Sequence, residues 1–260
     1  MRSLLCTLAV AGLLGANRPA LAEWSVNFQL EHYQWKEETT PEVKIKGWQP
    51  GIGLTWEQDK EGGWRFRYRG ELYAGSFDYE GATLSGTPLT DTADYSGISN
   101  EVDALYRPLA ESFFQLVTGL GLDYWERRFP FSASGTSISG HQQEDWTTLF
   151  LRVGLEAGNR TRRGWFAGTG LKYTLGTRVN AHFDDVGFDQ NPEVSPGRMF
   201  SAYAEAGYRL ASQWRMTVYY EGYRFSQSPA VTVTSGATAR SFVQPESRQD
   251  EAGLRLEYVF

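Results

Sequence analysis

The sequence predicts an all-β fold, a transmembrane antiparallel up-and-down β-barrel of about ten strands. Three observations support this prediction: segments that alternate apolar and polar residues, connections that alternate between short and long, and a composition that is hydrophilic on average but rich in aromatic residues. Mean hydropathy is only −0.44, yet 15% of residues are aromatic, with 9 Trp and 14 Tyr. A membrane barrel reconciles these values, because only every second strand residue faces lipid and the others can be polar.

The alternation is clearest in residues 64–72. The even positions there are mostly apolar, whereas the odd positions carry Arg65, Arg67, Arg69 and Glu71. A period of two indicates a strand with one apolar and one polar face. The same pattern predicts strands at 24–36, 44–57, 64–78, 98–107, 113–126, 146–157, 164–177, 199–210, 214–225 and 249–260.

Connection length alternates along the chain. Short joints are expected at 58–63, 108–112, 158–163 and 211–213, and long polar loops at 79–97, 127–145, 178–198 and 226–248. Short turns on one side and long loops on the other are typical of outer-membrane barrels, whose long loops lie outside the cell. Val231 and Val233 alternate with threonines, so we expect the last loop to extend as a hairpin. Eight or twelve strands remain alternatives.

The first 22 residues resemble a secretory signal, with Arg2 at its start, an apolar run at 4–14 and a small-residue cleavage site at 20–22. We therefore expect residues 23–260 to form a single barrel domain. Cys6 is the only cysteine, so the exported part has no disulfide. Removing Arg2 and Arg18 takes the formal charge from −6 to −8, which argues against nucleic-acid binding.

Tryptophans are expected to form belts at both membrane interfaces. Five lie at strand ends near the short turns or the N-terminus, and three lie near the opposite rim. The first group is Trp24, Trp56, Trp64, Trp165 and Trp214, and the second is Trp35, Trp125 and Trp146.

The last strand has apolar residues at every second position, counted back from the carboxyl end: Leu254, Leu256, Tyr258 and Phe260. It resembles the terminal strand of Gram-negative outer-membrane proteins. That resemblance implies recognition by the barrel assembly machinery through the aromatic last residue, and a location in the outer membrane.

Charged residues on the polar strand faces are expected to line the lumen. Buried charges need partners, so these residues predict either a hydrogen-bonded plug or a selective path for ions or solutes. The set comprises Arg65, Arg67, Arg69, Glu71, Glu101, Asp103, Arg107, Arg152, Glu156, Lys172, Glu205, Arg215, Glu221, Arg255 and Glu257.

Histidine is scarce, with only His32, His141 and His182, so we expect no metal site and no other cofactor. The candidate catalytic residues are Asp78 and Glu80 at one strand end and His182 with Asp184 at another. Carboxylates that face a histidine across a cleft can activate water as a general base.

Strand number, length and loop pattern resemble the omptin family, outer-membrane endopeptidases that cleave beside basic residues with an Asp pair facing an Asp-His couple. Short fragments are similar in order: 100–103, 182–184, 206–208 and 252–254. The chain departs from the omptin pattern at Asn180, where the couple would have its Asp, and at Asp78-Tyr79-Glu80 in place of Asp-x-Asp. Residues 33–37 and 70–79 look more like a group of uncharacterised proteobacterial outer-membrane barrels, which implies a location and a fold without an activity.

Three functions follow as hypotheses: a non-enzymatic surface barrel that is structural or interacts through its loops, a divergent omptin-like endopeptidase, and a narrow porin-like channel. The expected partners are outer-membrane lipid and, during biogenesis, the assembly machinery. The sequence does not specify a surface ligand.

Overall fold

The computed structural model describes residues 22–58, 63–82, 87–109, 112–132, 139–210, 213–236 and 238–260. The expected signal segment, apart from Ala22, lies outside the described residues. No helix in the described part of the chain is long and apolar enough to cross a bilayer.

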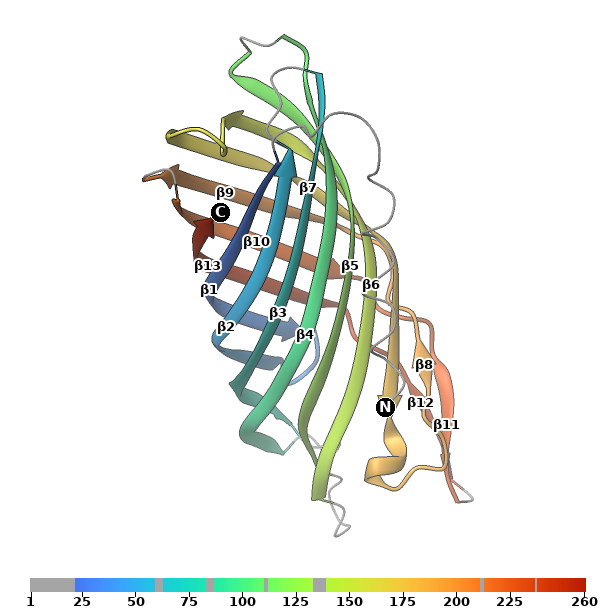
Figure 1. Ribbon diagram of the computed structural model, residues 1–260. Coiled ribbons are helices and arrows are strands. Elements are labelled where there is room, and N and C mark those ends of the chain that lie inside the picture. The colour runs from blue at the N-terminus through green and yellow to red at the C-terminus, as the bar shows by residue number, and fades with distance from the viewer. Residues whose placement is uncertain are drawn as a thin grey trace.

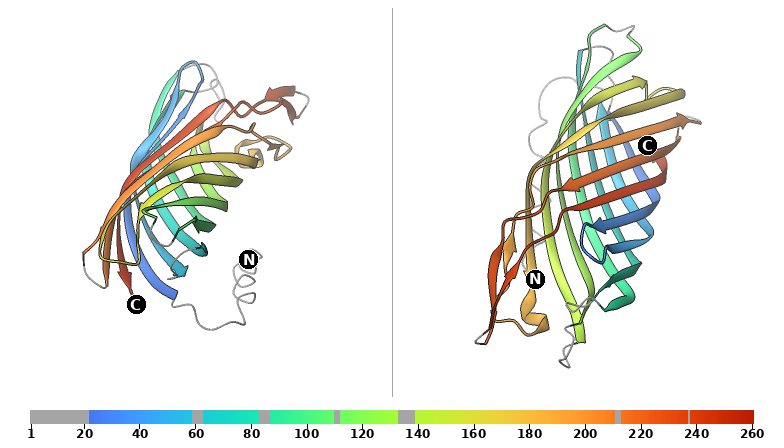
Figure 2. Two further views of the ribbon diagram at one scale, coloured as in Figure 1. Left: turned by 90° about the horizontal axis from the view of Figure 1, so that it is seen from above. Right: turned by 180° about the vertical axis from the view of Figure 1, so that it is seen from behind.

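Ten antiparallel strands close into a barrel, as the alternation predicts (Figures 1 and 2). Closure is complete because β1 pairs with β13 and β6 pairs with β7. The wall strands are β1 (Ala22–Glu37), β2 (Val43–Gln58), β3 (Gly63–Ala82), β4 (Pro88–Arg107), β5 (Phe114–Ser132), β6 (Ser139–Gly158), β7 (Gly164–His182), β9 (Phe200–Arg209), β10 (Trp214–Phe225) and β13 (Ser247–Val259).

Two expected surface loops are largely strand. Strands β3 and β4 pair without interruption from Gly63 to Ala82, and β5 and β6 pair through most of 127–145. The predicted loops 79–97 and 127–145 are therefore mainly extensions of the wall. Their composition is polar because this part of the wall rises above the apolar belt, while inward residues such as Phe77 and Tyr95 keep the strand alternation.

The remaining elements gather at the end with the longer connections. The 3₁₀ helix η2 (Phe183–Val186) and the short β8 (Glu193–Val194) follow β7. The predicted hairpin is present as β11 (Val231–Ser235) paired with β12 (Thr238–Phe242). It lies at the end of the barrel opposite the C-terminus (Figure 2).

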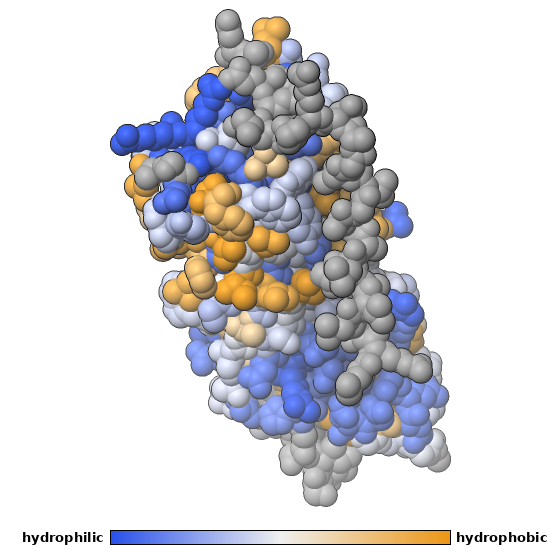
Figure 3. Space-filling model, viewed as in Figure 1, coloured by the Kyte–Doolittle hydropathy of each residue, from blue (hydrophilic) through white to orange (hydrophobic). Residues whose placement is uncertain are grey.

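A belt of apolar side chains surrounds the barrel. Figure 3 shows it as a band across one face, with hydrophilic side chains gathered beyond it toward the hairpin end. Trp24, Trp64, Trp165 and Trp214 are exposed at the edge nearest the termini, and Trp48 is 61% exposed near the opposite edge. Apolar side chains directed outward and polar side chains directed inward are the arrangement of a barrel in lipid.

The prediction for the outer tryptophan belt is wrong. Trp35, Trp125 and Trp146 are at most 1% exposed and pack inside the barrel. Each occupies an inward-facing position of its strand. Trp35, for example, lies on the same face of β1 as the buried Glu31 and Tyr33. Strand parity therefore decides the side of the wall on which a tryptophan lies.

Candidate functional site

The residues proposed as a peptidase-like site do not converge. In strand β3, the odd-numbered residues from Arg65 to Tyr79 face the lumen. Asp78 is therefore exposed on the outer face, and Glu80 lies on the same side. The Nζ of Lys46 lies 2.9 Å from Oε1 of Glu80. Neither carboxylate is directed into the barrel mouth.

A β-bulge turns His182 outward. The pairing of β6 with β7 shifts at Leu175, so Leu149 is opposite Gly176 while Phe150 is opposite Thr174. A single extra residue reverses the alternation. Even-numbered residues of β7 such as Lys172 are buried before the bulge, and odd-numbered ones such as Val179 are buried after it.

His182 is paired on the outer side of the wall instead. Its Nε2 lies 2.8 Å from Oδ2 of Asp145 on the neighbouring strand β6, and Asp184 is exposed in η2. The donor atoms of His182, Asp184 and Asp185 lie within 4.8 Å of one another. Three donors from one short segment, two of them exposed, are a weak ligand set for a divalent cation.

The charged side chains expected in the lumen lie on inward strand faces, and all of them are buried except the half-buried Glu71 and Glu221. Arg67 Nη1 and Nη2 lie 2.8 Å from Glu156 and Asp103, respectively. Arg152 is hydrogen-bonded to Glu101 at 2.9 Å and stacks over the ring of Tyr203. Further ion pairs join Arg69 to Glu101, Lys172 to Glu221, Arg215 to Glu257 and Arg255 to Glu71.

Sequence reasoning missed several members of this network. Arg160 lies in the connection between β6 and β7, yet it is 2% exposed and reaches Glu156 and Glu205. Glu57 and Gln115 sit on inward positions near Arg65. Parity could have identified Glu57 and Gln115, but nothing in the sequence shows that a turn residue folds back into the lumen.

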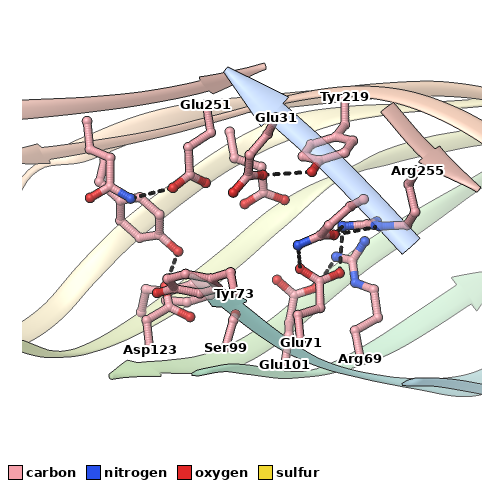
Figure 4. A pocket seen from close by; sticks show the side chains of 15 residues that line it. Glu31, Arg69, Glu71, Tyr73, Ser99, Glu101, Asp123, Tyr219, Glu251 and Arg255 are labelled. Atoms are coloured by element: carbon pink, nitrogen blue, oxygen red, sulfur yellow. Dashed lines mark hydrogen bonds and ion pairs between the residues drawn. The ribbon is translucent and has the colours of Figure 1, made fainter. Parts of the chain in front are cut away.

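A cavity of about 50 Å³ lies above this ion layer (Figure 4). It has room for a few water molecules. Tyr219 donates to Glu31 at 2.7 Å, Tyr223 donates to Asp123, and Gln249 donates to Glu251 at 2.6 Å. None of these three carboxylates has an ion pair within the described residues, so their hydrogen bonds come from neutral donors, and Oδ1 of Asp123 has no partner there.

Aromatic rings fill the lumen beyond the cavity. Trp35, Trp125, Trp146 and Phe225 have ring centroids 5.1 to 6.4 Å apart. Tyr33, Phe77 and Tyr95 form a second cluster with centroids 4.8 to 5.1 Å apart. We call these seven residues the aromatic plug; it separates the cavity from the mouth of the barrel.

A second pocket, of about 450 Å³, opens above the plug. Its floor is Arg127, which lies 2.7 Å from Glu144 and 2.9 Å from Glu37. The guanidinium also lies over the rings of Trp35 and Trp146. The walls are mainly apolar and include Val43, Ile45, Tyr79, Phe129, Phe183, Phe188, Val233 and Phe242. We call this space the mouth pocket.

Two loops that are far apart in sequence form one wall of the mouth pocket. The ring of Phe183 in η2 meets that of Phe242 in β12 edge to face at 4.6 Å. Asp189 accepts a hydrogen bond from the backbone of Gly236 and donates its own N–H to Thr234. The hairpin is thus fastened to the segment after β7, which gives the pocket a defined shape.

No protein-family model matches the chain, and no curated protein matches its sequence. Among solved structures, the chain is similar to the outer-membrane protease OmpT of Escherichia coli, with a TM-score of 0.54 and 12% identity over 92% of this chain and 96% of that one. It is also similar to the translocator domain of the autotransporter NalP of Neisseria meningitidis, with a TM-score of 0.52 and 11% identity over 96% and 91%. At these identities the likeness concerns fold: the chain has the closed antiparallel β-barrel fold of outer-membrane proteins.

Proposed function

We propose that this chain is an integral outer-membrane barrel, closed to solutes, that binds a small apolar or aromatic group in the mouth pocket without catalysing a reaction. The apolar belt and the fold support the membrane location. The inward ion layer and the aromatic plug support closure, because each fills the lumen at a different depth. The aromatic last residue, Phe260, which directly follows β13, supports recognition by the assembly machinery.

The observation that carries the binding function is the mouth pocket. Its volume lies within the usual range for small-ligand sites, and its lining combines apolar walls with a few polar groups at the floor. Arg127 with Glu37 and Glu144 leaves one formal negative charge at the floor, and Arg240 on the hairpin side of the lining balances it, so the pocket has no net formal charge. An uncharged ring or alkyl group therefore fits this pocket better than an ionic ligand.

An endopeptidase function has no comparable support. Asp78, Glu80, His182 and Asp184 lie on the outer face or in solvent, where they do not enclose a substrate. Residue 180 is an asparagine, which cannot hold an imidazolium as a carboxylate does.

The test is binding of the neutral fluorescent probe N-phenyl-1-naphthylamine to the refolded protein in detergent. Arg240 lines the pocket, is exposed and lies opposite the pocket-facing Val233 on the hairpin, so Arg240→Trp should fill the space without disturbing a buried side chain. We expect this variant to bind at least about tenfold more weakly, because a blocked pocket loses more than about 1.4 kcal/mol of apolar burial. The matched control is Thr232→Trp, at an exposed residue on the other face of the same hairpin, which is not part of the lining. Equal affinity in wild type and both variants would refute the proposal.

A further inference from the structure

Two carboxylates at the floor of the mouth pocket each use only one oxygen within the protein. Glu37 and Glu144 line the pocket and are 9% and 2% exposed. Oε1 of Glu37 accepts hydrogen bonds from Nη2 of Arg127 at 2.9 Å and from Nε1 of Trp35 at 3.0 Å. Oε2 of Glu144 accepts them from Nε of Arg127 at 2.7 Å and from Nε1 of Trp146 at 2.9 Å. The second oxygen of each carboxylate has no hydrogen-bond partner within the described residues and is open to the pocket.

The two open oxygens, Oε2 of Glu37 and Oε1 of Glu144, belong to neighbouring carboxylates. Nε and Nη2 lie next to each other on the planar guanidinium of Arg127, so the carboxylates that they bind are adjacent. A carboxylate oxygen removed from bulk water needs a donor, and the described side chains supply none for these two. The side chain of Glu37 is 11% exposed and that of Glu144 is 3% exposed, so Glu37 is the more accessible acceptor.

The walls above these acceptors suit a flat ring. The rings of Tyr79 and Phe129 are stacked, with centroids 6.0 Å apart and planes inclined by 10°. Phe183 and Phe242 add ring surface from the loop side. Aromatic side chains favour stacked or edge-to-face contacts with a further ring. Because the mouth pocket has no net formal charge, a neutral group is the best carrier of the donor that its floor lacks.

We propose that the ligand of the mouth pocket is a phenol, a neutral aromatic ring whose hydroxyl donates a hydrogen bond to Oε2 of Glu37. This inference rests on the proposed function and names its class of ligand. A hydroxyl suits the site better than an N–H group, because hydrogen bonds from O–H to a carboxylate are the shorter of the charge-assisted bonds. An analogue without the hydroxyl leaves the buried acceptor without a donor and is therefore rejected.

The experiment compares ligands that differ in the donor alone, by isothermal titration calorimetry of the refolded exported chain in detergent at neutral pH. The ligands are 2-naphthol, 2-methoxynaphthalene and naphthalene. The signal that is lost in Arg240→Trp reports binding in the mouth pocket, because that variant fills the pocket and leaves partition into micelles unchanged. Wild type should bind 2-naphthol about tenfold more tightly than either analogue, as expected for one hydrogen bond to a charged acceptor.

The acceptor is tested with a matched pair of variants. Glu37→Gln keeps the shape of the side chain and removes the charge, so the preference for 2-naphthol should fall at least about threefold. Glu38→Gln makes the same change at the next residue, which is exposed and does not line the pocket, and should keep the wild-type preference. The heat-dependent mobility shift of each variant checks folding. The comparison of ligands in wild type needs no variant of Glu37 and so does not depend on its folding.

The outcomes separate this inference from the proposed function. A wild-type preference below about threefold, with all three ligands still excluded by Arg240→Trp, would overturn the inference and leave the binding function in place. An unchanged preference in folded Glu37→Gln would also overturn it. Equal binding of every ligand to wild type and Arg240→Trp would instead refute the proposed function.

Discussion

The two halves of the lumen are closed by different chemistry on the same alternating backbone. Near the short turns, arginines and carboxylates from many strands form a continuous network around Arg67 and Arg152. Toward the mouth, rings replace charges, and the space above Arg127 stays open as a pocket of about 450 Å³. The comparison teaches that a buried charge needs hydrogen-bonded partners, whereas packed rings fill the lumen without them and can support an open pocket above.

The largest expected effect is in the ion layer. Arg67→Met leaves Asp103 and Glu156 without their closest cation, and loss of one partner from a buried network costs about 3–5 kcal/mol. Urea unfolding in detergent, followed by tryptophan fluorescence, measures this change. A loss below about 1 kcal/mol would mean that the inner half does not depend on paired charge.

The aromatic half should respond through packing. Trp146→Ala removes a fully buried ring and its 2.9 Å hydrogen bond to Glu144, for an expected loss of about 3 kcal/mol. Trp165→Ala is the matched control, because its ring is 73% exposed and should change unfolding in detergent by no more than about 0.5 kcal/mol. Similar losses in the two variants would contradict the assignment of the plug.

An alkaline titration tests the wall of the mouth pocket. Burial raises the pKa of Tyr79 to about 12, so the folded state favours the neutral phenol. The contribution of Tyr79 to the free energy of unfolding is intact below pH 10, the pKa of an unfolded tyrosine. It is lost as the pH rises from about 10 to about 12. Between pH 9 and pH 11.5, the free energy of unfolding should therefore fall in both proteins, but by up to about 2 kcal/mol less in Tyr79→Phe than in wild type. Parallel declines in urea unfolding would show that Tyr79 is solvated.

The smallest effect should come from a salt bridge outside the lumen. Arg178 pairs with Glu193, and their side chains are 67% and 48% exposed. Arg178→Met should cost at most about 1 kcal/mol in the same urea assay, because water screens the pair. A loss equal to that of Arg67→Met would remove the contrast between buried and exposed ion pairs.

Strand alternation predicts the barrel, its ten wall strands and the hairpin around Val231. It succeeds because lipid on one side and a narrow lumen on the other impose opposite polarities on neighbouring residues. The same parity, applied to Trp35 and Asp78, would have placed the first inside the barrel and the second outside. The closeness of both residues to a strand end instead suggested a membrane-interface position for Trp35 and a place in the mouth for Asp78. Position along a strand is therefore a weaker guide than alternation.

The candidate site could not be predicted in the same way. The bulge at Leu175 reverses the faces of β7, and nothing in the local sequence reveals a register shift against β6. The mouth pocket depends on contacts between η2 and β12, which are more than 50 residues apart in the sequence. Such contacts follow from the closed barrel and are not encoded in any local pattern.

Single-channel recording in planar bilayers tests the central claim, closure of the lumen by two independent layers, most directly. Wild type should give no conductance steps, and neither should Trp146→Ala, because the ion layer still fills the lumen below the opened plug. Reproducible steps from the wild-type protein would contradict the account.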